Sequence, residues 1–362
     1  MPETPLSHET LYAAQPTIRV NGAEQARLGA LLLAMEMEEQ EDGLSRLELK
    51  FSNIASNPEG GAEFAFEDER AFKLGDQIAI YAGDHSGPQE IFSGRISALE
   101  AGFYDDASPT LTLLAEDKLQ AARMKRRTKT HDNLTIASLA QAIAGDLGLT
   151  PQVSGLSDSL GTQVQLNESD LAFLRRLLAR NDGDLQVVGD ELHVSPRGEV
   201  RRGNVELRLN GQLRRATILA DLAHQVTEVT VTGWDTAQGA RITGRSTGSH
   251  RGPGAGRTGA ELLSTALNAR SHAISHLAVN TDAEARALAD AAFDERQRRF
   301  VTVRGTAEGN PALRVGTHVT LTGLGPRFSN TYYVVRASHR YDLEHGYETD
   351  FTAEGAFLGS PA

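Results

Sequence analysis

The sequence of 362 residues contains no cysteine, which excludes disulfide bonds and thiolate metal sites and leaves the redox compartment open. It also lacks any apolar run of about 18 residues, the length that a membrane-spanning helix needs. The longest such run, residues 28–35, favours a buried strand or a short core segment. The N-terminus has no basic stretch followed by an apolar one, so no signal peptide is expected. These absences predict a multi-domain protein that is made in the cytoplasm and has no membrane segment.

Basic residues are the scarcer charged class. The chain has 36 Lys and Arg residues against 48 Asp and Glu residues, a formal net charge of −12. A surface that binds nucleic acid needs a basic face, so specific nucleic-acid binding is not expected. One basic strip, residues 118–131, has no aromatic residue on which a base could stack. We interpret this strip as a solvated connector or a subunit contact.

An acidic cluster occupies residues 36–42, within a β-hairpin predicted over residues 33–51. Loops that bind hard cations need spaced, convergent oxygen ligands, and this run lacks that spacing. We interpret the cluster as a solvated edge of the hairpin.

Alternating apolar and polar residues predict strands in both halves of the chain. The C-terminal stretch, residues 313–355, carries three such patterns separated by Gly, Pro and Asn, which predicts an antiparallel meander. Near the other end, after a loose arm over residues 1–16, residues 17–22 predict a strand that closes on an Asn-Gly turn. Further strands are predicted over residues 72–83, 91–103 and 110–117, and later over 205–211 and 226–235.

Between these strands the periodicity changes to that of helices. Residues 136–147 predict an amphipathic helix with Thr135 as its N-cap and Gly148 at its end. Residues 167–181 predict a second helix, and a hairpin over residues 185–195 follows it. A long flexible Gly-rich loop is expected over residues 236–262. It precedes a third helix over residues 281–299, which has capping-box spacing at its start.

Four sequence blocks recur in the same order, which indicates an internal repeat. They match residues 17–22 with 206–211, 44–53 with 226–235, 74–80 with 315–321, and 110–117 with 348–355. The last two matches have nearly equal offsets, 316 − 75 = 241 for two glycines and 353 − 115 = 238 for two alanines. We therefore predict two copies of one small β-barrel, because closing a sheet removes its exposed edges.

The predicted fold class is mainly β with α+β insertions. Two similar small β-barrels form a tube-like pseudo-repeat, and a small α+β module separates them. The predicted parts are a first β-barrel with an N-terminal arm (1–130), the α+β module (131–200), a second β-barrel (201–235 and 300–357), and a Gly-rich loop with a helix inserted into the second barrel (236–299).

No motif for catalysis, a cofactor or a metal stands out. Residues 239–246 have the spacing of a phosphate loop, but Arg245 replaces its lysine and no helix is expected after Ser246. His272 and His276 have the spacing of a zinc-binding helix, but Ala273 stands where the general-base glutamate would be. Carboxylate pairs of the glycosidase type assemble only in three dimensions and are left open. The sequence therefore predicts no enzyme, no cofactor, and no catalytic or metal-binding residue.

Three stretches together resemble one protein family. They are residues 167–194 (NESDLAFLRRLLARNDGDLQVVGDELHV), residues 228–235 (EVTVTGWD), and the C-terminal segments 309–323 and 328–351. These stretches resemble the phage late control protein D family, the baseplate hub of contractile tails. They are also similar to the hub half of the valine-glycine-repeat protein G of type VI secretion.

The resemblance implies a homotrimer in which two barrels per chain make a ring of six around a channel. Such a ring would join a hexameric tail tube to a trimeric spike. The implied partners are further copies of the chain, a separate central spike protein, the tail tube (initiator) protein, and the tape-measure and wedge proteins, with DNA or cargo passing through the channel. The chain would then be part of the baseplate of a phage tail, a tailocin or an extracellular injection particle.

On this hypothesis the outer strands of each barrel form the contacts between subunits. The candidate interface or ring-forming residues are Ile78, Ile80, Ile96, Leu111, Leu113, Val229, Val231, Val319, Leu321, Tyr333, Val335, Tyr347 and Phe351. Two other function classes stay open: a glycan-binding module for cell walls over residues 131–200, and a tail enzyme that degrades the cell envelope.

Overall fold

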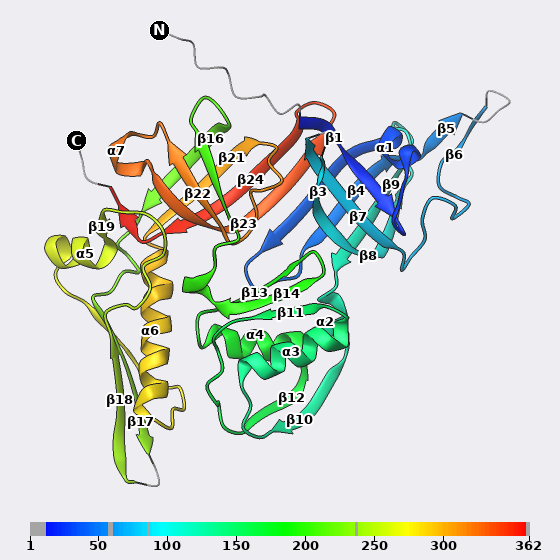
Figure 1. Cartoon of the computed structure of the whole chain (residues 1–362). Coiled ribbons are helices and arrows are strands. Elements are labelled where there is room, and N and C mark those ends of the chain that lie inside the picture. Colours follow the sequence, from blue (N-terminus) through cyan, green and yellow to red (C-terminus); the bar gives the residue numbers. More distant parts are fainter. Residues whose placement is uncertain (1–11, 57–60, 85–86, 236–237, 360–362) are drawn as a thin grey trace.

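The computed structural model describes residues 12–56, 61–84, 87–235 and 238–359. One large curved sheet runs through both halves of the molecule, and in the view of Figure 1 the two helix-containing units with α3 and α4 and with α6 lie below it. The predicted fold class is confirmed, since the chain is mainly β with α+β insertions. The strand order of the large sheet is β16-β21-β24-β23-β3-β4-β9-β8-β7-β1-β2, and β22 joins β15 to β23.

The first half of this sheet is an antiparallel unit built around one apolar core, with Phe51, Ile78 and Leu113 fully buried. Its strands alternate buried and exposed residues, as the sequence pattern predicts. Its elements are β1 (Tyr12–Val20), β2 (Ala23–Glu24), α1 (Ala26–Leu31), β3 (Leu32–Gln40), β4 (Arg46–Ser52), β7 (Gln77–Asp84), β8 (Gln89–Gly102) and β9 (Thr110–Asp117). A small hairpin, β5 (Ile54–Ser56) with β6 (Ala62–Phe64), projects from it.

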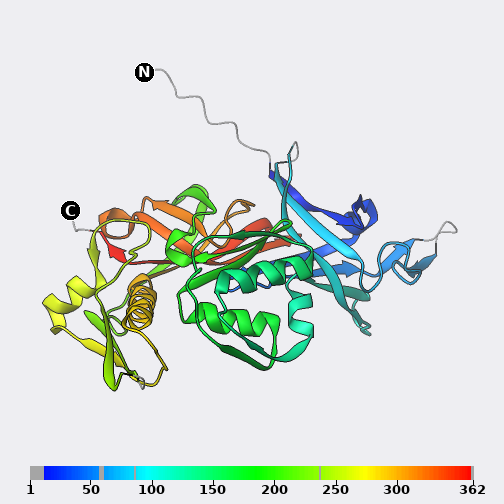
Figure 2. The same cartoon turned by 60° about the horizontal axis from the view of Figure 1, so that its bottom comes forward.

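An α+β module follows, with its own core between two helices and two small sheets. Thr135 caps the predicted helix α3 (Ile136–Leu147), and Gly148 ends it in the left-handed conformation. Figure 2 shows α3 and α4 side by side. The other elements are α2 (Gln120–Met124), β10 (Arg126–His131), β11 (Thr150–Val153), β12 (Gln163–Ser169), α4 (Asp170–Ala179), β13 (Gly183–Val188), β14 (Glu191–Pro196) and the 3₁₀ turn η1 (Arg197–Glu199).

The second half of the large sheet has a separate core around Tyr332, Val303 and Phe351. Its elements are β15 (Gly203–Arg208), β16 (Leu213–Ala220), β21 (Val301–Glu308), β22 (Thr317–Thr322), α7 (Gly325–Phe328), β23 (Asn330–Asp342), β24 (Gly346–Gly355) and β25 (Phe357–Leu358). The predicted C-terminal meander corresponds to β22, β23 and β24.

A fourth unit is inserted between β16 and β21. The three-stranded sheet β18-β17-β20 packs against the long helix α6, and Val231 and Phe293 lie in the core between them. Its elements are β17 (Glu228–Asp235), β18 (Ala240–Ser246), β19 (Arg257–Thr258), α5 (Gly259–Leu267), β20 (Ser271–Ile274) and α6 (Asp282–Arg298). As predicted, Thr281 caps α6, by accepting a hydrogen bond from the backbone N–H of Glu284.

The two sheet halves repeat one another strand by strand. The order β7-β8-β9-β4-β3 in the first half corresponds to β22-β23-β24-β21-β16 in the second. Arg95 pairs with Glu116, and Tyr333 pairs with Glu354, at equal offsets of 333 − 95 = 238 and 354 − 116 = 238. The β-bulge between Ile96 and Ala98 recurs at the same offset between Val334 and Arg336.

A second bulge also recurs. It lies between Leu32 and Ala34 in β3 and between Leu213 and Arg215 in β16, at an offset of 213 − 32 = 181. Bulges are local features that re-aim a strand, so two bulges at equivalent places mean that the halves share one backbone plan. The halves also differ: β1 pairs with β7 antiparallel, whereas β15 pairs with β22 parallel. The register shift between Ile80 and Tyr81 in the β7–β8 pairing has no counterpart in the β22–β23 pairing.

One of the four sequence matches is wrong. Residues 226–235 form β17, which lies in the inserted sheet and not in the second half of the large sheet. The strand equivalent to β4 is β21, since both lie beside the matched strands β9 and β24. Alternating strands resemble one another in sequence, so alternation alone could not separate β17 from β21.

Several local predictions also need correction. Residues 236–262 are no long loop, because among the described residues β18 pairs with β17 along its whole length and α5 follows. The basic strip forms α2 and β10, and β10 pairs with β12. Residues 28–35 are divided between α1 and β3, and the second predicted helix begins only at Asp170. Of the predicted arm, residues 1–11 lie outside the described residues, and the strand β1 already begins at Tyr12.

Candidate functional site

The two sheet halves meet where β23 pairs with β3. The antiparallel register joins Arg336 to Gln40 at one end and Asp342 to Ala34 at the other. Only the second part of β23 makes this pairing, because its first part pairs with β22. We call this pairing the strand junction.

One face of the strand junction is polar and continues over the neighbouring strands. Arg336 Nε lies 2.7 Å from a Glu38 carboxylate oxygen, and Arg340 Nε lies 2.8 Å from Asp350. Arg215 on the outer strand β16 donates to the Thr306 hydroxyl. A shallow hollow of about 720 Å³ lies over these strands. Because Arg and acidic side chains alternate across it, this face presents no single sign of charge.

The other face of the strand junction is buried. Glu39 is 1% exposed and accepts hydrogen bonds from the Arg314 guanidinium and the Val315 backbone N–H, both at 2.6 Å. Burial alone would raise the pKa of Glu39, but the Arg314 charge and these hydrogen bonds outweigh it and hold the pKa below its usual range. On the same face, burial and Arg314 lower the pKa of His339 to about 3, so this imidazole is neutral.

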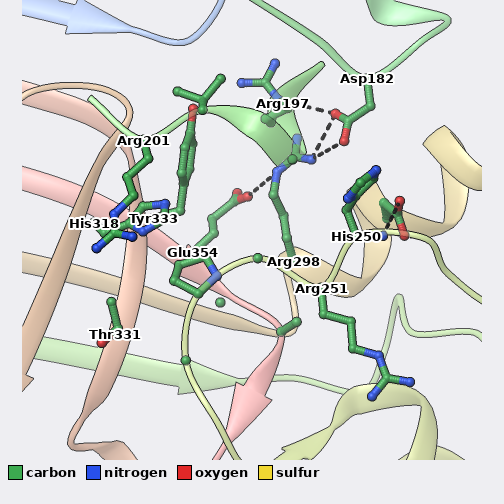
Figure 3. Close-up of a pocket in the computed structure, with 18 of the residues that line it drawn as sticks. Asp182, Arg197, Arg201, His250, Arg251, Arg298, His318, Thr331, Tyr333 and Glu354 are labelled. Carbon is green, nitrogen blue, oxygen red and sulfur yellow. Dashed lines mark hydrogen bonds and ion pairs between the residues drawn. The ribbon is translucent and has the colours of Figure 1, made fainter. Parts of the chain in front are cut away.

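A second buried cluster lies beside the strand junction, where all four units meet. We call it the ionic junction, and Figure 3 shows part of it. Its members come from the β3–β4 turn, the α+β module, α6 and β24: Glu41, Asp182, Asp184, Arg197, Arg202, Arg298 and Glu354.

Arg197 is the centre of the ionic junction. Its guanidinium contacts Glu41 and lies 3.2 Å from Asp182 and 3.5 Å from Asp184. Arg298 lies 2.9 Å from Asp182 and 3.2 Å from Glu354. The prediction that acidic residues 36–42 form a solvated edge is therefore wrong for Glu38, Glu39 and Glu41. Buried carboxylates need charged partners, and the arginines that supply them lie far away in the sequence.

Protonation in the ionic junction depends on burial. Burial raises the pKa of Glu41 to about 7, although Arg197 and Arg298 act in the opposite direction. The neighbouring carboxylates of Glu354 and Asp184 add to the increase. The Tyr333 hydroxyl, which lies at the edge of this cluster, also has a raised pKa because it is buried.

A pocket of about 600 Å³ opens beside the ionic junction (Figure 3). It contains a serine, a histidine and an aspartate, but Ser249 donates its hydroxyl directly to Asp294 at 2.5 Å. His250 donates only its backbone N–H to the same carboxylate. A catalytic triad needs the imidazole between serine and aspartate. The arrangement therefore orders the loop over the pocket and does not activate the serine.

Other sequence candidates are likewise not arranged for chemistry. Residues 240–246 are the strand β18, so no phosphate loop forms there. His272 lies in β20 and not on a helix. Among the described residues, no group of three or more His, Asp or Glu side chains could hold a metal ion. None of the helices in the described part of the chain combines the length and apolar character that crossing a membrane requires.

The thirteen candidate interface residues lie in the interior of the chain. Twelve are buried, and Val335 is half-buried. Eleven of them are divided among three cores, with Val229 and Val231 against α6 and nine others in the two sheet halves. Tyr333 lies beside the ionic junction instead. Their strands β7, β9, β17, β22, β23 and β24 are paired on both sides within the chain, and so is β8 as far as Ile96. These side chains hold the cores together, and any role of their strands in a ring stays a prediction.

Sequence reasoning missed the ionic junction. Arg197, Arg298 and Asp184 come from three separate elements, and no spacing links them. The one signal in the sequence was the acidic run over residues 36–42. Carboxylates that lie this close together are either exposed to water or paired with cationic side chains, and such pairing would have indicated a buried ionic cluster.

Solved structures share this fold. The 43 kDa tail protein of prophage MuSo2 from Shewanella oneidensis matches with a TM-score of 0.68 at 14% identity, covering 94% of this chain and 97% of that one. A tail protein from Neisseria meningitidis matches with a TM-score of 0.64 at 12% identity, covering 95% and 96%. At this identity the likeness concerns the fold, and it confirms the resemblance to tail proteins at that level.

A third structure is the c3393 protein of E. coli, described as a component of the type VI secretion system with structural similarity to bacteriophage tail proteins. It matches with a TM-score of 0.55 at 13% identity, covering 95% of this chain and 79% of that one. No protein of curated function matches the sequence. A family model does match, over residues 15–342, and it is described as the Alg8 N-terminal domain. With most of its length covered by that match, the chain belongs to the Alg8 N-terminal domain family.

Proposed function

We propose that the chain is a structural hub of a contractile tail or injection particle. In this role it is a homotrimeric adaptor that joins a hexameric tail tube to a trimeric spike and surrounds the central channel. The observation that carries the proposal is the repeat of the two sheet halves, in which strand order, register and both bulges recur. The likeness to tail proteins and to a component of type VI secretion supports it.

The repeat has a direct consequence for symmetry. Three copies of a chain that carries two equivalent sheet halves place six equivalent units around a threefold axis. Such an assembly can contact a sixfold partner on one side and a threefold partner on the other.

The polar face of the sheet is the proposed channel wall. Arginines on it pair with carboxylates, as Arg336 does with Glu38 and Arg340 with Asp350, so the wall carries both signs of charge. A polyanion binds by releasing counterions from many basic contacts at once. A wall of mixed charge therefore retains DNA or an acidic cargo less than a uniformly basic wall would.

In this proposal the chain acts by assembly and not by catalysis. We propose the predicted first barrel, α+β module, second barrel and insertion as the domains of the hub, with residues 226–235 assigned to the insertion. Four separate apolar cores support this division. The spike, the tube initiator, and the tape-measure and wedge proteins are the proposed partners.

The test is the molar mass of the purified full chain, measured by light scattering after size exclusion over a concentration series. The mass of one chain is 39.0 kDa, so the expected trimer has three times 39.0, or 117 kDa. A dimer, a tetramer, or a monomer at every concentration would contradict the proposal.

A further inference from the structure

Two segments of the large sheet, the end of β8 and the strand β16, have an unpaired edge. They are the equivalents of β23 and β3, the two strands that pair at the strand junction. At the offset of 238, residues 98–102 at the end of β8 correspond to residues 336–340 of β23. The two residues after β8, 103 and 104, correspond by the same offset to residues 341 and 342. At the offset of 181, β16 corresponds to β3. In the chain β23 pairs with β3, so the equivalent partners are the end of β8 and β16.

Both edges are open in the described part of the chain. β7 pairs with β8 only from Gln89 to Arg95, and the backbone bond from Gly75 to the Ile96 carbonyl is the last on that side. In the second half the equivalent hydrogen bond joins the Gly316 N–H to the Val334 carbonyl. From Arg336 onward, the same edge of β23 is paired with β3. β16 pairs with β21 alone among named strands, and a single bridge joins Leu213 to Leu209. Unpaired sheet edges of this length are ready to accept a further strand.

The two open edges lie on opposite halves of the molecule, so one chain does not pair them with each other in the large sheet. We infer that the end of β8 in one copy pairs with β16 of the next copy, in the antiparallel register of the strand junction. This inference rests on the proposed function, because it supplies the contact by which three chains close into a ring.

The register follows from the two offsets. Within the chain Ala337 lies opposite Glu39, and Ser338 lies opposite Glu38. Subtracting 238 converts a residue of β23 to its equivalent in β8, and adding 181 converts a residue of β3 to its equivalent in β16. The first pair becomes 337 − 238 = 99 and 39 + 181 = 220, and the second becomes 100 and 219. Between copies, Leu99 then lies opposite Ala220, and Glu100 lies opposite Leu219.

Side-chain exposure supports this pairing. On the core side of the strand junction, Ala337 and Met37 are fully buried, at 0% exposure each. Their equivalents are Leu99, which is 40% exposed, and Ile218, which is only half-buried. The same strands thus carry apolar side chains in both halves, and these side chains are covered only where the neighbouring strand is present.

An exposed aromatic side chain provides the strongest sign. In the second half, Tyr341 reaches across the strand junction and packs in the core of the first half, where it is 8% exposed. Its equivalent at the same offset is Phe103, since 341 − 238 = 103, and this residue directly follows β8. Phe103 is 63% exposed, although its ring contacts Phe64 of the β5–β6 hairpin at 5.7 Å between ring centroids. The inferred pairing inserts Phe103 into the second-half core of the next copy, beside Ile218 and Ala216, which are only partly buried there.

The absence of cysteine allows a direct test by disulfide trapping. In the double variant Glu100→Cys/Leu219→Cys, the two thiols of adjacent copies lie directly opposite each other on the exposed side of the sheet. Cβ atoms of opposed residues in an antiparallel pair lie about 4.5–5.5 Å apart, near the separation of a disulfide. Mild oxidation of the full chain is expected to give covalent dimers and trimers on a non-reducing gel.

The matched control is Glu100→Cys/Ile218→Cys, which moves one thiol by a single residue to the opposite side of the sheet. It is expected to remain unlinked. If the wild-type chain has the mass of a trimer and the two variants link equally, or neither links, the inferred edge pairing is wrong while the proposed function stands. If the wild-type chain forms no trimer, both fail.

A second variant tests the aromatic contact. Phe103→Ala is expected to raise the apparent dissociation constant of the ring at least about tenfold, because a buried phenylalanine contributes enough apolar burial for such a change. Leu343→Ala is the control, since Leu343 is 69% exposed and lies in the turn between β23 and β24, away from both edges. Equal effects of the two substitutions would overturn the role of Phe103.

Discussion

Glu39→Ala tests whether the strand junction depends on its buried ion pair. The substitution removes a carboxylate that is 1% exposed and leaves the Arg314 guanidinium and the Val315 N–H without their acceptor. Breaking one side of a buried ion pair costs about 3–5 kcal/mol. The Arg314 side chain is 24% exposed and can reach some water, so we expect the lower end, about 3 kcal/mol.

The assay is urea unfolding followed by far-UV circular dichroism, with the free energy of unfolding from linear extrapolation. Glu39→Gln keeps an acceptor for the Val315 N–H but leaves the charge of Arg314 unpaired. Its free energy of unfolding should therefore lie between that of the wild type and that of Glu39→Ala. The control is Asp190→Ala, which removes the surface pair of Lys118 with a carboxylate that is 83% exposed. Exposed pairs contribute about 0–1 kcal/mol. A loss for Glu39→Ala as small as that of Asp190→Ala would refute the reasoning.

Two further predictions concern other parts of the chain. Burial raises the pKa of Glu41 to about 7, so the folded state holds this proton more tightly than the unfolded state, and the free energy of unfolding should fall as pH rises from about 5 to 7. In Glu41→Gln the difference between the free energies of unfolding at pH 5 and pH 8, measured with urea, should be smaller by about 1–3 kcal/mol. An unchanged pH profile would count against the raised pKa. Gly244 lets β18 approach the backbone of α6 closely, since an added Cβ would lie 2.2 Å from the Ala285 carbonyl carbon. Gly244→Ala should therefore lower the free energy of unfolding of the inserted unit by about 1–3 kcal/mol in the same urea assay. Gly239→Ala should lower it less, because Gly239 has a left-handed φ of +63° but open space around it.

Local patterns predicted much of the secondary structure. The boundaries of α3 and its cap at Thr135 follow from sequence, because periodicity, N-cap and terminal glycine agree. The C-terminal meander follows for a similar reason, since alternation and turn residues coincide in β22, β23 and β24. Within the inserted sheet, β18 was missed, because only Ala240 and Ile242 among its seven residues are apolar and because it is stabilised by its pairing with β17.

The internal repeat could be predicted, but only in part. Two of its matches, residues 74–80 with 315–321 and 110–117 with 348–355, fall on truly equivalent strands, β7 with β22 and β9 with β24. The match that failed involved β17, which belongs to the small sheet β18-β17-β20 and buries its apolar face against the helix α6. Alternation reports that one face of a strand is buried and carries no information about what buries it.

The ionic junction could not be predicted at all. Glu41 and Arg197 are 156 residues apart and meet only because four units fold around them. The same holds for the candidate interface residues. Apolar character marked them as buried, and it could not distinguish a core within one chain from a contact between chains. The exposed equivalents of buried residues, such as Phe103 beside Tyr341, become visible only when the two halves are aligned in register.

The measurement that tests the central claim most directly is electron cryo-microscopy of the assembled full chain, viewed along its symmetry axis. The account predicts three copies with six equivalent sheet halves around the axis and alternating strand contacts, β23 with β3 within a chain and β8 with β16 between chains. A different number of copies, or a ring in which the two halves of a chain occupy unrelated positions, would contradict it.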